Sequence, residues 1–277
     1  MKTELLNYLT YPKFNKTQQK EFVESSIIEL RAAIAKNNFL DYVFQKKLSN
    51  DKNDCVREAL ASNIYLHDDL HEKLLNDKSF DVQIAMIKNI NLNDVLKEKI
   101  AKSDDEMLRY RIAQNKRLFE HVQKILVNDK CHFVRAAIAD NSCLFSKFYE
   151  KLADDENDTV RIAISKKHDL PFKLQKKLLR DKNKNVVFNV LINPGLDQKL
   201  FNIFVKHKDI FYRTAIALNP KLPEKFQQIL LYDNHDDVRA NLAKNKSVNI
   251  HILKQLASHP VKKISTAALK NLCTKIN

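Results

Sequence analysis

Two charged residue types recur in step along this chain. Arginine occupies the second place of a short repeated block seven times, and aspartate lies six residues before that place six times. Such pairs can form bidentate ion pairs, or the arginines can form a stripe that binds phosphate. Because the aspartate recurs with the arginine, we interpret the set as a structural ladder that pairs within or between repeats. The predicted ladder comprises Asp51, Arg57, Asp129, Arg135, Asp155, Arg161, Asp233 and Arg239.

Other residues with metal or catalytic chemistry are scattered. His67 and His71 are four residues apart, as zinc ligands on one helical face would be, but no glutamate follows the first histidine. We expect both to be solvent-exposed. Cys55, Cys131, Cys143 and Cys273 form no C-x-x-C pair, which favours free thiols in a reducing, cytoplasmic compartment. With a single glycine and no G-x-S-x-G, we predict no catalytic residue, no metal and no cofactor.

The charged residues belong to a block of about eight residues that returns every 26 positions, ten times, from Leu30 to Ile264. With the first residue of each block as position 0, positions 0, +4 and +5 are apolar almost throughout and position +3 is mostly alanine. This spacing predicts one face of a short helix. Apolar residues at +10, +14 and +18 predict a second, antiparallel helix. The fold class is therefore an all-α solenoid of about ten 26-residue, two-helix repeats.

Asparagine occupies position +7 in nine of the ten repeats. Asparagine tolerates the left-handed conformation that ends many helices, and it also bonds neighbouring backbone groups. The unit from 186 to 211 deviates most, with Val187 in place of arginine, the only glycine at Gly195, and His207 in place of the loop aspartate. We interpret this unit as sequence drift; the alternative is a local change of curvature at a binding site.

The repeats resemble those of the leucine-rich repeat variant family, whose pattern runs Asp, Val-Arg, Ala, Asn-Pro, Leu-Pro and spaced Leu. The best match runs from Tyr212 to Pro223, and the next unit adds Asp233 and Val238-Arg239. The six-residue interval also resembles HEAT repeats, where such residues form an interior ladder. The resemblance spans about residues 25–273. It implies a right-handed helical solenoid with a binding role, and it does not imply an activity. Some members carry an iron–sulfur cluster on N-terminal cysteines, but no cysteine precedes Cys55 here.

We expect residues 1–29 to form an N-terminal cap and residues 30–277 a single elongated repeat domain. The net charge of +14 permits an acidic partner, but the lysine excess accompanies abundant asparagine and isoleucine, a bias typical of AT-rich genomes. No signal peptide and no stretch of 18 apolar residues are evident. We expect a cytoplasmic monomer that does not insert into membranes.

The first helix of each pair should line the concave face, with positions +2 and +6 outward. Position +6 is often lysine and position +2 is often apolar or aromatic. Such a face suits a protein or peptide, or nucleic acid through phosphate contacts and base stacking. Alternatively, the +2 residues pack between helices and the lysines are only solvated. The candidate binding residues are Lys36, Lys88, Tyr110, Lys166, Phe188 and Lys244.

Our first hypothesis is a non-enzymatic scaffold that binds a protein or peptide along this concave face. The alternative is a nucleic-acid-binding solenoid that uses a basic face. A narrower variant is a HEAT-like DNA glycosylase, which needs a carboxylate and stacking aromatic rings around an extruded base. Its candidate residues lie in separate repeats, and the chain has no tryptophan. These candidates are Glu58, Tyr110, Asp140 and Phe188.

Overall fold

The computed structural model describes residues 12–276 as helices joined by short loops, with no strand in that range. The expected all-α solenoid of repeated helix pairs is confirmed. The chain divides into two compact units, one ending at Phe148 and the other beginning at Tyr149. Within residues 12–276, no helix combines the length and the apolar character needed to cross a membrane.

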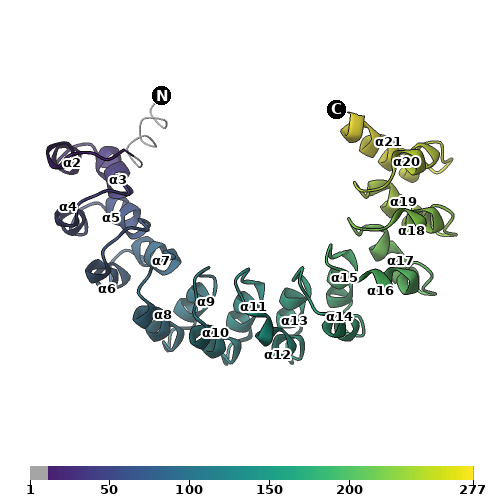
Figure 1. The fold of residues 1–277 in the computed structure, drawn as a ribbon, viewed down its shortest axis with the longest axis horizontal. Helices are drawn as coiled ribbons and strands as arrows, with labels where there is room; N and C mark the ends of the chain where they lie inside the picture. Colours follow the sequence, from purple (N-terminus) through teal and green to yellow (C-terminus); the bar gives the residue numbers. More distant parts are fainter. Residues whose placement is uncertain (1–11, 277) are drawn as a thin grey trace. The chain divides into compact units, whose positions relative to one another are not determined.

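In the first unit the helices form two layers (Figure 1). Consecutive first helices pack against each other in one layer: α3 (Ile28–Ala35), α5 (Asp54–Ala61), α7 (Phe80–Lys88), α9 (Glu106–Ala113) and α11 (His132–Asp140). The second helices form the other layer: α2 (Lys16–Val23), α4 (Tyr42–Leu48), η1 (Asp68–Leu70) with α6 (His71–Leu75), α8 (Asp94–Ala101), α10 (Glu120–Val127) and the short η2 (Ser146–Phe148).

The second unit repeats this arrangement (Figure 1). Its first helices are α13 (Asp158–Ser165), α15 (Lys184–Ile192), α17 (Ile210–Ala217), α19 (Asp236–Lys244) and the longer α21 (Lys262–Ile276). Its second helices are α12 (Tyr149–Ala153), α14 (Phe172–Leu178), α16 (Gln198–Phe204), α18 (Glu224–Leu231) and α20 (Ile250–Ala257).

The core of each unit lies between its two layers. The apolar positions that predicted the helices are buried, as Leu66, Leu70 and Leu74 are in the second-helix series. Burial of each such side chain stabilises the fold by about 1.5–3 kcal/mol. Alanines at position +3, such as Ala59 and Ala215, are also buried, which lets neighbouring first helices approach closely.

The predicted N-terminal cap, residues 1–29, lies partly outside the described residues. In the described part, α2 packs against α3 and α4 and so occupies the place of a second-layer helix. Asn15 caps α2: its side chain accepts a hydrogen bond from the Gln18 backbone N–H, and the Gln18 side chain accepts one from the Asn15 N–H.

Gly195 has a steric role in the deviant unit. A Cβ atom at this position would lie 1.8 Å from the backbone carbonyl oxygen of His168. The φ angle of Gly195 is not positive, so the glycine is required by close contact between loops and not by a left-handed turn. The Gly195 loop therefore approaches the loop of the preceding repeat more closely than a side chain allows.

Candidate binding surface

Arginines at position +1 hold aspartate carboxylates that lie 20 residues further along the chain. Arg109 Nε lies 2.7 Å from Asp129 Oδ2, and Arg109 Nη2 lies 3.1 Å from Asp129 Oδ1. Both side chains are at most 5% exposed. These are the bidentate, charge-assisted bonds that arginine forms best. The same pairing joins Arg31 to Asp51, Arg57 to Asp77, Arg161 to Asp181 and Arg213 to Asp233.

The aspartate six residues before an arginine makes a different contact. Arg57 Nη1 donates to the backbone carbonyl of Asp51 at 2.7 Å, whereas the Asp51 carboxylate pairs with Arg31. An aspartate such as Asp51 therefore connects the arginines of two consecutive repeats. The carbonyls of Asp129, Asp155 and Asp233 accept in the same way from Arg135, Arg161 and Arg239.

Hydrogen bonds from Arg57 hold the pKa of the Asp77 carboxyl below its ordinary value, and Asp77 in turn raises the pKa of Arg57. Both groups are therefore charged at neutral pH and satisfied by each other. Because these arginines are buried and paired with aspartates, they do not form a surface that could bind phosphate.

Two repeats lose the arginine and the matching aspartate together. Gln83 and Ser103 stand at these two positions in one repeat, and Val187 and His207 in the other. Gln83 still donates to the Asp77 carbonyl, at 2.6 Å. Joint loss agrees with the high cost of leaving one buried charge without its partner.

The asparagines at position +7 form a second ladder. Asn115 Nδ2 donates to the carbonyls of Ile87 and Asn89 in the preceding repeat, at 2.7 and 3.1 Å, and its Oδ1 accepts from the Arg117 N–H at 2.9 Å. Both polar atoms of this buried side chain therefore have hydrogen-bond partners. Equivalent bonds to the preceding repeat are made by Asn63, Asn89, Asn141, Asn193, Asn219, Asn245 and Asn271.

The expectation of a left-handed asparagine at the helix end is wrong. No residue in the described part of the chain has a positive φ, and Asn89 ends α7 in an extended conformation with φ −61° and ψ 121°. This conformation suits a side chain that bonds across to the preceding repeat, because the carbonyls it contacts lie there and not in its own helix.

Glutamine at position +15 forms a third ladder that the apolar pattern did not reveal. Gln45 Nε2 donates to the carbonyls of Leu40 and Tyr65, and its Oε1 accepts from the His67 N–H. These bonds join one second helix to the loop of the next repeat. The signal in the sequence is glutamine at spacings that are multiples of 26 residues: Gln19, Gln45, Gln123, Gln175 and Gln227.

His71 takes the glutamine position in its repeat and is fully buried, so its expected exposure is wrong. Its Nδ1 accepts from the Asn93 N–H at 3.0 Å, and its Nε2 is buried without a partner. His67 is exposed as expected. The difference arises because position +15 faces the next repeat, whereas position +11 lies at the surface.

Acidification should destabilise the first unit through His71. Burial lowers the pKa of His71 below its ordinary value of 6.5. Asp68 and the backbone of Leu66 oppose this shift, and Lys97 and His67 add to it. The unfolded chain then binds a proton before the folded one, so stability is complete above about pH 6.5 and falls as pH drops toward the folded-state pKa. Urea unfolding measured between pH 7.5 and 5 should show this decline.

The variant His71→Gln should lose this part of the pH dependence, because glutamine restores the bonding found in other repeats without a titrating group. Replacement of the exposed His168 by glutamine provides the matched control and should leave the decline unchanged. Equal pH profiles for wild type and His71→Gln would contradict the assignment.

The predicted binding residues lie on the first helices. Lys36, Lys88, Lys166 and Lys244 are exposed, whereas Tyr110 and Phe188 are half-buried, as are Ile84 and Ile162 at the same repeat position. Arg111 lies 5.8 Å from the centre of the Tyr110 ring. The +2 side chains are thus partly packed and partly available to a ligand.

The lysines do not form a continuous row. Along position +6 of the first unit, Lys36 and Lys88 alternate with Ser62 and Gln114, and the run ends at Asp140. In the second unit, Ile192 and Leu218 separate Lys166 from Lys244. The face therefore carries mixed apolar, polar and basic groups.

The glycosylase candidates lie on separate helices. Glu58 lies on α5 and Asp140 at the end of α11, with α7 and α9 between those helices, and Tyr110 lies on α9. Phe188 belongs to α15 in the other compact unit. Within the first unit, Glu58, Tyr110 and Asp140 therefore come from three different repeats.

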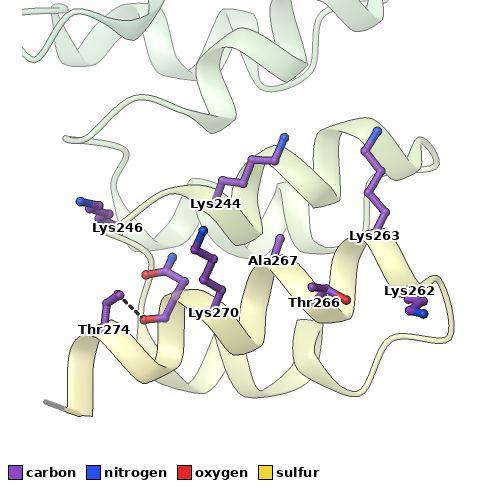
Figure 2. Close-up of a pocket in the computed structure, with 9 residues that line it drawn as sticks. Lys244, Lys246, Lys262, Lys263, Thr266, Ala267, Lys270 and Thr274 are labelled. Atoms are coloured by element: carbon purple, nitrogen blue, oxygen red, sulfur yellow. Dashed lines mark hydrogen bonds between the residues drawn. The ribbon is translucent and has the colours of Figure 1, made fainter.

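A pocket of about 700 Å³ opens beside α19 and α21 in the second unit (Figure 2). Lys244, predicted from the sequence, lines it together with Lys270. The further basic residues were missed, because Lys246 follows the repeated block and Lys262 and Lys263 precede it, where most earlier repeats carry other residue types. The remaining lining residues are Thr266, Ala267, Asn271 and Thr274.

Histidines and cysteines do not gather into a metal site in the described range 12–276, where no three His, Cys, Asp or Glu side chains could share a metal ion. The four cysteines are free thiols there, with Cys131 half-buried and the others exposed.

A solved structure described as "a leucine-rich repeat variant with a novel repetitive protein structural motif" is similar to this chain. The match covers 80% of this chain and 88% of that one, with a TM-score of 0.53 and 18% sequence identity. The predicted resemblance is thereby confirmed at the level of the fold. A crystal structure of an engineered protein matches 94% of this chain and 98% of its own at 12% identity, but its TM-score of 0.28 supports no argument. No family model and no curated protein match.

Proposed function

We propose that this repeat protein is a non-enzymatic scaffold that binds a protein or peptide segment along the layer of first helices. The observation that carries the proposal is the mixed character of that layer. Half-buried apolar residues at position +2, such as Ile84 and Tyr110, alternate with exposed lysines and neutral side chains at position +6. Partly exposed apolar groups rimmed by polar ones are typical of protein-binding surfaces.

The hydrogen-bond ladders support the same proposal. Arg109, Asn115 and Gln123 are buried, and each donates a hydrogen bond to a backbone carbonyl of a neighbouring repeat. These polar groups stabilise the stacking of the repeats. The side chains at the outward positions +2 and +6, which vary between repeats, are therefore the ones that can determine which partner binds. Stacked repeats commonly present extended binding surfaces of this kind.

The alternative, nucleic-acid binding, is less well supported by the same surface. Position +6 is interrupted by Asp140 in the first unit and by Ile192 and Leu218 in the second. A groove that binds along the phosphate backbone of a nucleic acid needs a more continuous positive charge. The predicted cytoplasmic location and monomeric state stay predictions.

The proposal is tested by truncating apolar side chains on one layer at a time. Wild-type chain and variants are incubated with nuclease-treated lysate, and the protein that each retains is measured. The double variant Ile84→Ala/Tyr110→Ala should retain at least about 80% less protein than wild type, because a few apolar and aromatic side chains contribute most of the binding energy of an interface. The matched control is Val95→Ala/Phe119→Ala, which truncates exposed apolar residues on α8 and at the start of α10. Equal loss in the control, or no loss in the first variant, would contradict the proposal.

A further inference from the structure

The lysine pocket beside α19 and α21 has a separate role, and we propose that it binds a small ligand that carries two or more adjacent phosphate groups. This site goes beyond the scaffold function and does not depend on it. Five lysines line the pocket: Lys244, Lys246, Lys262, Lys263 and Lys270. Figure 2 shows Lys244, Lys263 and Lys270 extending to the same side of the two helices.

Most of this positive charge is not neutralised by the protein. Lys263 forms an ion pair with Asp237. Among the described residues, no carboxylate lies within ion-pair distance of the other four lysines. Lys244 lies 3.5 Å from the Asn241 side-chain oxygen, and its charge helps to lower the pKa of Asp237 from a longer distance. Like charges gathered without counterions repel each other and oppose folding. A bound polyanion would remove that repulsion.

The cluster is a local feature of this pair of repeats and does not follow from the repeat pattern. One repeat earlier, the positions that correspond to the five lysines hold only one basic residue. Two of the others are acidic and two are apolar. A general excess of lysine in the chain does not explain why all five of these positions hold lysine in one pair of repeats. The corresponding residues are Leu218, Pro220, Asp236, Asp237 and Lys244.

The size of the pocket selects the class of anion. A volume near 700 Å³ corresponds to a sphere about 11 Å across, within the range of small-molecule sites. An extended peptide places side chains of one face about 7 Å apart, so it would bring only two carboxylates into this space. Two phosphate groups carry about three to four negative charges in less room. Adjacent phosphates therefore match the four lysines that form no ion pair better than an acidic peptide does.

The walls of the pocket favour phosphate over a nucleobase. Besides the lysines, the lining consists of Thr266, Ala267, Asn271 and Thr274, with no aromatic ring on which a base could stack. Lysine recognises phosphate as a flexible point charge and needs no fixed planar geometry. The predicted ligand is thus defined by its phosphates and not by an attached ring.

Calorimetric titration of the full chain with tripolyphosphate at about 100 mM salt tests the assignment. The double variant Lys244→Gln/Lys270→Gln should bind about tenfold more weakly, because two charge-assisted contacts are lost. Lys206→Gln/Lys254→Gln removes the same charge from exposed sites elsewhere in the second unit and should stay within about twofold of wild type. Thr266→Glu, which places a carboxylate in the pocket, should also weaken binding.

Three comparisons define the ligand further. Orthophosphate should bind at least about tenfold more weakly than tripolyphosphate, because it engages fewer lysines. An octaglutamate peptide should also bind more weakly, and vesicles containing phosphorylated inositol lipid should be displaced by tripolyphosphate. Absence of tripolyphosphate binding, equal weakening in both double variants, tighter binding of octaglutamate, or vesicle binding that tripolyphosphate does not displace would each overturn the proposal.

Discussion

Replacement of Arg109 by leucine should lower the free energy of unfolding of the first unit by about 3–5 kcal/mol, because it leaves the buried Asp129 carboxylate without its counter-charge. Arg109 also donates to the carbonyls of Ser103 and Asp104 in the loop before α9. One side chain thus ties two successive loops together. Urea unfolding and hydrogen exchange of the α9 and α11 amides measure the loss.

Neutral residues already stand at the two corresponding positions in the same unit, Gln83 and Ser103, and Gln83 still donates to the carbonyl of the preceding loop. The double variant Arg109→Gln/Asp129→Ser copies that pair. Its destabilisation should be smaller than the sum of the two single substitutions by about 1.5–3 kcal/mol, because neither partner is left charged and buried alone. Additive effects would show that the ion pair does not couple the two loops.

Replacement of Asn115 by alanine should cost about 2–4 kcal/mol, since the carbonyls of Ile87 and Asn89 and the N–H of Arg117 all lose a buried partner. Hydrogen exchange should accelerate first in α9 and the loop that follows it, because the lost bonds connect that loop to the preceding repeat.

Asn128→Ala provides the control for this substitution. The Asn128 side chain is exposed and donates only to the Lys124 carbonyl within its own repeat, so its removal should change stability by less than about 0.5 kcal/mol. Similar losses in the two variants would contradict a specific role for the buried asparagine ladder.

Much of the fold could be predicted because a 26-residue recurrence repeats the same local information along the chain. The apolar spacing fixes the helical faces, and Leu66, Leu70 and Leu74 are buried as that spacing requires. The constant repeat length implies stacking, since one helix pair cannot bury its own apolar face.

The bonds between repeats could not be assigned in the same way. Asp51 lies six residues before Arg57 and 20 residues after Arg31, and both intervals recur, so spacing alone does not choose the carboxylate's partner. Asn89 suits a left-handed turn by its local preferences, but bonds to the preceding repeat determine its conformation. The pocket was missed in part because Lys262 and Lys263 depart from the repeat instead of following it.

The central claim is that the layer of first helices binds protein. Site-specific photo-crosslinking in the native cell tests it, with a photoreactive phenylalanine in place of Tyr110 on α9 and, as the control, in place of the exposed Phe119 beside α10. We predict an adduct at position 110 that is destroyed by protease and survives nuclease, and no such adduct at position 119. A nuclease-sensitive adduct at position 110, equal adducts at both positions, or none at position 110 would contradict the claim.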